Sequence, residues 1–424
     1  DWETFGEYLD SLARLPRTLD VGAMLSHGAV RAYVMGNRGA NNEEATPEDI
    51  AAMAAVVGDG MAAGALGFSS SRTLIHCSVD GEPVPGTYAS EEELVALAKA
   101  VKDSGRGVFE MVPNGIAGEA DVLLEETRLM DRVARASGAP LVFLLLQHGL
   151  HSDQWRQQLE ICEAARRDGV ALIPQVAARP PAVLFSFQGD NPFEYLPSFA
   201  SLKGLPLAEK IARLRDPELK RTLLSEKDPN TTGMSLIYKS PTVWESTYLM
   251  GTPLSYTPDT ENSIAKIAAR ENRDPRELAY EMMLENDGDT FLMYSVVNYI
   301  DGNSDAMAEM IRNETAVLGL SDAGAHVRQV IDASIHTYML THWVRSFEEG
   351  HPYHMPLEFV VKKLTSDNAK LFGMNDRGVL RAGAKADINL IDFDNLHVDH
   401  PHIVADLPAD MPRLMQTAKG YVAT

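Results

Sequence analysis

VLGLSDAGAHVR, residues 317–328, is the stretch that decides the fold. Its apolar and small residues run as far as Ser321 and Asp322 and then give way to Ala-Gly-Ala-His. This pattern is typical of a buried parallel strand that ends at the mouth of an α/β barrel. Barrel enzymes carry out their chemistry where the strands end, so a carboxylate there is placed to bind a metal or to transfer protons. The structural alternative is a turn aspartate that accepts backbone hydrogen bonds.

Strand-like runs alternate with helical patterns along the chain, which is the signature of βαβ units. The predicted strands are Val21–His27, Gly64–Ser69, Val108–Val112, Leu141–Gln147, Val170–Val176 and Ala316–Ser321. Helices are predicted between them, for example after Thr46-Pro47 and after Ser90, which forms a capping box with Glu93. A closed barrel of this type has eight strands, two more than these. Because the chain opens in a helical pattern at Asp1, we expect the other two upstream of it.

Composition limits the function classes. The chain has 424 residues and a formal net charge of −22, which argues against nucleic acid and anionic membrane surfaces as partners. No apolar run approaches the ~18 residues of a membrane span, and no signal peptide is recognisable. Cys77 and Cys162 are too few for a disulfide framework, so we expect a reducing compartment and a cytoplasmic location.

Two changes of texture indicate the domain organisation. Residues 178–290 are rich in proline, aromatic residues and short helical pieces, which predicts a long insertion that shapes a substrate pocket. Near Asn375 the pattern changes to glycine turns and short β strands. We therefore expect a barrel over residues 1–374, with that insertion, and a smaller β unit over residues 375–424.

Several segments together resemble one family. They are LSHGAVRAYVMG (25–36), GALGFSSSRT (64–73), GLSDAGAH (319–326), LTSDNAKLFGMNDRGVLRAGAKADINLID (364–392) and GYVAT (420–424). In this order they resemble the N-acyl-D-amino-acid deacylase (D-aminoacylase-like) branch of the amidohydrolase superfamily. The resemblance implies a metal-dependent (β/α)₈ TIM-type barrel with a small β-sandwich built from both chain ends. It also implies that this chain is a fragment, without the first strands and part of the sandwich.

By this resemblance, Asp322 is the family carboxylate at the end of the last barrel strand. It would bind or face a metal-activated water, accept the proton of that water and later protonate the leaving amine. The resemblance implies a divalent metal, zinc first, whose His-x-His ligand pair would precede Asp1.

The other metal ligands of the family do not match this chain. The resemblance expects a histidine on each of two central strands, at positions that here are Met111 or Val112 and Leu145. His148 would replace one of them as a metal ligand if the register slips, and Glu110 would offer an oxygen. A barrel that has lost catalysis fits the loss of both histidines equally well.

Five further residues are candidates for substrate binding. His27 resembles part of the family's GHG element, and its alternative is a hydrogen bond at the barrel rim. Ser70 and Arg72 follow another strand end, where an arginine binds a carboxylate in bidentate fashion or is simply solvated. His326 and Arg328 lie close behind Asp322 and would orient the substrate.

The sequence therefore predicts a metal-dependent hydrolase that cleaves an amide bond in an N-acylated amino-acid-like small molecule. A cyclic-amide hydrolase on the same scaffold is one alternative. A non-catalytic barrel that binds a small molecule or a partner protein is the other. The fragment by itself is expected to be inactive.

Overall fold

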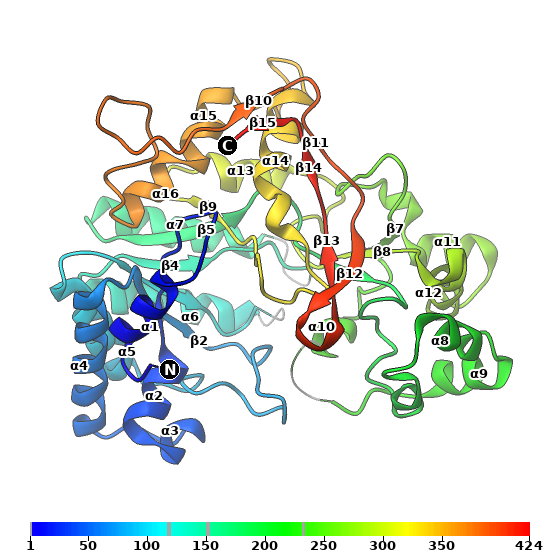
Figure 1. The fold of residues 1–424 in the computed structure, drawn as a ribbon, viewed down its shortest axis with the longest axis horizontal. Coiled ribbons are helices and arrows are strands. Elements are labelled where there is room, and N and C mark those ends of the chain that lie inside the picture. The colour runs from blue at the N-terminus through cyan, green and yellow to red at the C-terminus, as the bar shows by residue number, and fades with distance from the viewer. Residues whose placement is uncertain (1, 117–119, 150–152, 231–232, 234) are drawn as a thin grey trace.

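A six-stranded parallel sheet forms the centre of the computed structural model, which describes residues 2–116, 120–149, 153–230, 233 and 235–424. Its strands stand in the order β1-β2-β3-β4-β5-β9. They are β1 (Leu25–Ser26), β2 (Gly67–Ser71), β3 (Val108–Val112), β4 (Leu141–Leu144), β5 (Leu172–Ala177) and β9 (Val317–Gly319). Each overlaps one of the predicted strands, and the α/β barrel-type fold is confirmed (Figure 1). Among the described residues no strand pairs with the outer side of β1 or of β9.

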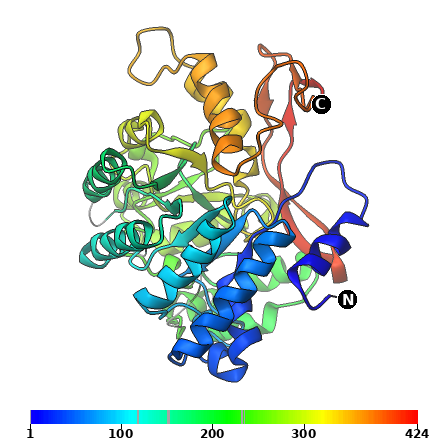
Figure 2. The ribbon, with the colours of Figure 1, turned by 90° about the vertical axis from the view of Figure 1, so that its left-hand side faces the viewer.

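Amphipathic helices cover the outer face of this sheet, as Figure 2 shows for the first half of the chain. They are α1 (Phe5–Ala13), α2 (His27–Met35), α3 (Asn37–Ala40), α4 (Pro47–Ala63), α5 (Glu91–Asp103), α6 (Ala120–Ser137), α7 (Gln154–Arg167), α13 (Asp305–Arg312), α14 (Ile335–Tyr338), a π-helix (Met339–Arg345), α15 (Leu357–Leu364) and α16 (Ser366–Leu371). The predicted N-cap at Thr46 is confirmed, since Thr46 accepts a hydrogen bond from Asp49 N at 3.2 Å. Ser90 caps its helix in the same way, accepting from Glu93 N at 3.2 Å, but the predicted capping box is not completed, because the Glu93 carboxylate binds Arg31 and His27.

The insertion between β5 and β9 has a sheet and a core of its own. Its elements are β6 (Ala182–Phe185), α8 (Leu207–Leu214), α9 (Pro217–Ser225), α10 (Ser235–Tyr238), β7 (Thr247–Leu249), α11 (Ile264–Glu271), α12 (Pro275–Leu284) and β8 (Leu292–Ser295). β8 pairs antiparallel with both β6 and β7. The core is aromatic, with the Tyr280 ring 5.2 Å from Phe187 and 5.1 Å from Phe193 between centroids. In Figure 1 this unit lies at the opposite end of the molecule from α4 and α5.

The C-terminal residues form short antiparallel strand pairs. They are β10 (Leu390–Ile391) with β15 (Tyr421–Ala423), β11 (His397–Val398) with β14 (Ala418–Lys419), and β12 (His402–Leu407) with β13 (Met411–Met415). The sequence predicts short β strands after Asn375, and these strand pairs agree with it. The assignment of this region to a β-sandwich stays a prediction. None of the described helices has both the length and the apolar character that crossing a bilayer requires.

The π-helix holds a partly buried imidazole that makes stability depend on pH. The His342 ring stacks on Tyr338 with centroids 4.6 Å apart, and its Nε2 atom is buried without a hydrogen-bond partner among the described residues. Burial lowers the pKa of His342 to about 4. The unfolded chain therefore takes up this proton first, since its histidine pKa is about 6.5. The stabilisation is complete above that pH and is lost as the pH falls towards 4.

We expect His342→Phe to remove this pH dependence. Relative to the variant, the wild-type protein should lose roughly 2–3 kcal/mol of unfolding free energy between pH 7 and pH 4.5, because one titrating group contributes about 1.4 kcal/mol per pKa unit. Urea denaturation at several pH values measures this difference. His336→Gln, on the exposed side of α14, is the matched control. Identical pH profiles for wild type and His342→Phe would contradict the assignment.

Candidate active site

The strands of the parallel sheet present two different faces. On β3, Phe109 and Met111 are buried in the main apolar core, while Glu110 and Val112 alternate to the opposite face and are only partly buried. On β2, Ser69 stands beside Glu110 in the strand register. Polar side chains therefore lie on the face of the sheet that the core does not fill, near the carboxyl ends of the strands.

Asp322 lies three residues beyond the end of β9. Its backbone has the left-handed conformation, with φ of 45°, and its carbonyl oxygen accepts a hydrogen bond from Ala325 N at 2.8 Å. The side chain is exposed and has no hydrogen-bond or ion-pair partner among the described residues. The turn is therefore closed by the backbone, and the carboxylate stays available for chemistry.

The negative charge of Asp322 affects the pKa values of three ionisable groups, Glu110, His76 and Asp332. Burial raises the pKa of Glu110, and the negative charge of Asp322 raises it further. Burial lowers the pKa of His76, and Asp322 opposes this by raising it. Burial likewise raises the pKa of Asp332, with Asp322 as a smaller contribution in the same direction. Glu110 itself has no hydrogen-bond or ion-pair partner among the described residues, so no positive charge there offsets the effect of Asp322 on its pKa.

Two imidazoles complete this group. The rings of His76 and His326 lie nearly parallel, 27° apart, with centroids separated by 6.4 Å. His76 lies in the loop after β2, where its Nδ1 is 2.7 Å from Ser71 Oγ. The sequence predicts His326 but not His76, because nothing local distinguishes His76 from a solvated loop histidine. The signal that would have found it is a serine-rich strand end with a histidine five residues later.

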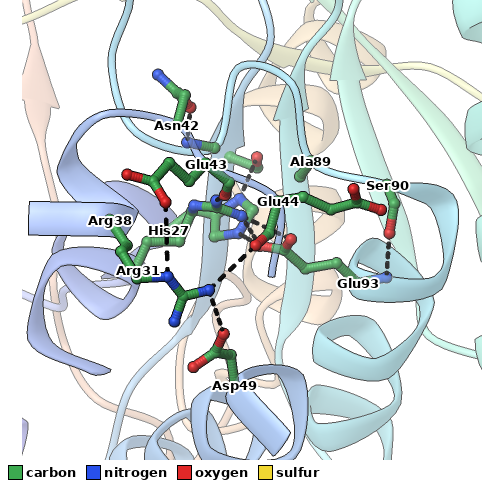
Figure 3. A network of polar contacts seen from close by, with 12 residues as sticks. His27, Arg31, Arg38, Asn42, Glu43, Glu44, Asp49, Ala89, Ser90 and Glu93 are labelled. Atoms are coloured by element: carbon green, nitrogen blue, oxygen red, sulfur yellow. Dashed lines mark hydrogen bonds and ion pairs between the residues drawn. The ribbon is translucent and has the colours of Figure 1, made fainter. Parts of the chain in front are cut away.

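His27 and Ser70 lie elsewhere, in a buried polar network between α2, β2 and α5. Figure 3 shows His27, Arg31 and Glu93 of this network. His27 Nδ1 is 2.8 Å from Ser70 Oγ, and His27 Nε2 is 2.8 Å from Glu93 Oε1. Arg31 Nη1 donates to both carboxylate oxygens of Glu93 at 2.6 Å. His27 is 1% exposed and Ser70 5%. Because this network is sealed on the helical side of the sheet, we do not propose either residue for substrate binding.

The two predicted arginines already bind carboxylates of the protein. Arg72 donates to both oxygens of Glu126, at 2.8 and 3.1 Å, and to Ala89 O at 2.8 Å. Arg328 lies 2.5 Å from Asp190 Oδ1 and 3.4 Å from Glu194 Oε1, both in the insertion. The structure thus joins Arg328 to the insertion and Arg72 to α6, and only His326 of the predicted substrate-binding residues lies beside the carboxyl pair.

A metal site does not arise from the described residues alone. His148 follows β4 and is buried, with 6% of its surface exposed. No three or more histidine, cysteine, aspartate or glutamate side chains within the described ranges are close enough together to hold a metal ion. The predicted combination of Asp322 with His148 as two ligands of one metal stays a prediction. Leu145 and Met111, where the resemblance expects imidazoles, are buried apolar residues.

Comparison with known proteins identifies related chains. Residues 1–421 match the amidohydrolase family. An uncharacterised protein of Mycobacterium tuberculosis is 22% identical over 419 residues, which are 93% of this chain and 64% of that protein. D-aminoacylase of Alcaligenes xylosoxydans xylosoxydans is 28% identical over 141 residues, 33% of this chain and 26% of the enzyme.

Solved structures of the same kind share the fold. N-acyl-D-glutamate deacylase from Bordetella bronchiseptica, crystallised with zinc and a phosphonate inhibitor, superposes with a TM-score of 0.54 at 21% identity. The match covers 92% of this chain and 66% of that enzyme. D-aminoacylase superposes with a TM-score of 0.54 at 19% identity, over 93% and 66% of the two chains. This chain thus spans less than two thirds of the length of these relatives.

Proposed function

The chain belongs to the amidohydrolase family, since the family match covers residues 1–421 of 424, and on this premise we propose a hydrolase that cleaves a non-peptide amide bond. The proposed substrate is an N-acylated amino-acid-like small molecule, the class that D-aminoacylase and N-acyl-D-glutamate deacylase are named for. One observation carries the proposal: the exposed, unpaired carboxylate of Asp322 beyond a parallel strand, within the field of the unpaired Glu110.

In this reaction a water oxygen bonds to the substrate carbonyl carbon while the carbon–nitrogen bond breaks. Asp322 accepts a proton from the attacking water and passes it to the leaving nitrogen, so that a carboxylic acid and an amine are released. Glu110 keeps its proton to a higher pH than an ordinary glutamate, because burial and Asp322 raise its pKa. A neutral carboxyl group of this kind donates a hydrogen bond to the oxygen that becomes negative.

Glu110→Gln tests this part of the proposal. We expect kcat to fall about 10- to 100-fold and the loss of activity at high pH to become flatter. The reason is that wild-type Glu110 stops donating as the pH rises through its raised pKa, whereas an amide keeps its donor. Glu125→Gln, on the exposed face of α6, is the control. A pH–rate profile for Glu110→Gln that matches wild type would contradict the role.

We further propose that the whole protein uses a divalent metal, zinc first, as the N-acyl-D-glutamate deacylase structure contains zinc. The donor set among the described residues does not fit such an ion by itself, so no step above is assigned to it. A zinc-dependent reaction would need ligands beyond this set. The cytoplasmic location is also a proposal, supported by two free cysteines, Cys77 and Cys162.

The test of the function is an amine-release assay. The substrates are N-acetyl-D-amino acids, their L-enantiomers and a cyclic amide, offered to the purified whole protein with and without added zinc. Release of free amino acid from the N-acetyl-D series supports the proposal. Turnover of the cyclic amide alone would favour the cyclic-amide hydrolase. Absence of turnover of every substrate, with zinc bound or not, would favour the binding protein, the alternative that Met111 and Leu145 at the ligand positions suggest.

A further inference from the structure

Arg179 is a buried arginine just beyond the end of β5. β5 is paired with β9 up to Ala177 and Gly319, so Arg179 lies next to the start of the segment that carries Asp322. The residue is 1% exposed. A guanidinium removed from water to this extent persists only where other groups compensate its charge and its hydrogen bonds.

The compensating groups belong to the far end of the Asp322 segment. Arg179 Nη2 donates to the carbonyl oxygen of Ile331 at 2.9 Å and to Asp332 Oδ1 at 2.5 Å. Asp332 is itself 4% exposed, and Arg179 is its only ion-pair partner among the described residues. β9 therefore holds the segment at residue 319, and the Arg179 guanidinium holds it at residues 331–332. Between these points Leu414 N donates to Val327 O at 2.7 Å and Leu184 N donates to Gln329 O at 2.8 Å.

The insertion and the C-terminal strands also lie close to the Arg179 side chain. The guanidinium carbon of Arg179 lies 3.5 Å from the centre of the Tyr256 ring, which belongs to the insertion. The Tyr256 hydroxyl accepts a hydrogen bond from Gln416 Nε2 at 2.8 Å, and Gln416 Oε1 accepts one from Ser334 Oγ at 2.7 Å. The barrel, the insertion and the C-terminal strands thus meet around this one side chain.

Three residues of the segment between residues 319 and 331 have backbone dihedral angles that are costly for residues with a side chain. Leu320, Asp322 and His326 all have positive φ, at 61°, 45° and 48°. Residues with a side chain adopt this left-handed conformation at a cost, and they keep it only where the surrounding structure leaves no alternative. Freeing residues 331–332 would remove one of the anchors that keep the segment in this conformation, and the segment that carries Asp322 would become more mobile.

We propose that Arg179 is a positioning residue of the site: by binding Ile331 and Asp332, it holds the conformation of the segment that carries Asp322. This inference rests on the proposed role of Asp322. It assigns to Arg179 no contact with substrate.

The first test needs no substrate. In Arg179→Met, backbone amide exchange over residues 320–332 should rise at least about 10-fold, while exchange in β3 stays unchanged. Arg128→Met, which removes an exposed arginine of α6, is the matched control. Unchanged exchange over residues 320–332 in a folded Arg179→Met protein overturns the inference whatever the activity. If Arg179→Met does not fold, Arg179→Lys, which keeps the charge and loses the forked geometry, is expected to show the same rise.

The second test uses the amine-release assay. We expect kcat of Arg179→Met to fall about 100-fold with KM within two-fold, because misplacing a reacting group costs about this much. Arg179→Met/Asp332→Leu removes both buried charges and should recover thermal stability without recovering kcat. Recovery of both, or a loss confined to KM, overturns the positioning role. An inactive wild-type protein would refute the proposed function, while the exchange test still decides whether Arg179 holds the segment.

Discussion

Asp322→Asn is expected to lower kcat by about 10²- to 10⁴-fold, the usual contribution of a general acid–base group. Asparagine has nearly the same shape but accepts no proton, so the variant removes the chemistry and leaves the packing. The fold should survive, because the carboxylate is exposed and no described residue bonds to it. The loss should therefore appear in turnover with little change in the thermal midpoint.

The assay compares Asp322→Asn with Asp80→Asn, an exposed aspartate in the loop after β2. Both proteins are first shown to be folded by circular dichroism and by their unfolding midpoints. Hydrolysis by Asp322→Asn at a near-normal rate would refute the assigned role. An equal loss in Asp80→Asn would show that the effect is not specific to the site.

Glu93→Gln is expected to lower the free energy of unfolding by about 3–5 kcal/mol, the effect of breaking a buried ion pair from one side. Glu93 is 2% exposed and receives hydrogen bonds from Arg31 and His27 (Figure 3). Burial alone would raise the pKa of Glu93, but these two partners outweigh it, and the pKa is lowered. The variant leaves the Arg31 guanidinium buried with no carboxylate to balance its charge.

Glu91→Gln is the control, two residues away in the first turn of the same helix. Glu91 pairs with Arg132, but 38% of its side chain is exposed, so the loss should stay below about 1 kcal/mol. Urea denaturation of the two variants beside wild type gives both values. Equal effects of the two substitutions would mean that burial does not distinguish these ion pairs.

Local patterns were enough to predict the strands of the parallel sheet, but not their ends. Val21–His27 was predicted and only Leu25–Ser26 forms a strand, because α2 begins at His27. Ala316–Ser321 was predicted and β9 stops at Gly319, because Leu320 has a φ of 61° that no strand accommodates. A run of apolar residues marks a buried strand, whereas its termini depend on the turn that follows.

Local sequence patterns predict the residues of the candidate site less well than they predict the strands. Asp322 is proposed from the sequence because a strand that stops at an acidic residue is a local signal, and its role stays a prediction. Ser70 was chosen as a site residue, but the alternation of a strand puts Ser69 and Ser71 on the site face and Ser70 on the helical face. A shift of one residue reverses the face, and the sequence does not specify it.

Partners that lie far apart in the chain were also beyond prediction. Arg72 was taken for a substrate ligand, and its guanidinium binds Glu126, 54 residues later. His76 and His326 come together from loops that begin at different strands. Such pairings follow from how the barrel brings strand ends together, and no short motif contains both members.

The insertion described above has an aromatic core of its own, but it also contributes Leu184, Tyr256 and Met293 to the main core. Partial unfolding of the insertion would therefore expose part of the main core as well. A backbone hydrogen bond joins the insertion to the segment that carries Asp322: Leu184 N donates to Gln329 O at 2.8 Å. The ion pair between Arg328 and Asp190 joins the same two parts, so we expect motion of the insertion to reach the segment that carries Asp322 through these contacts.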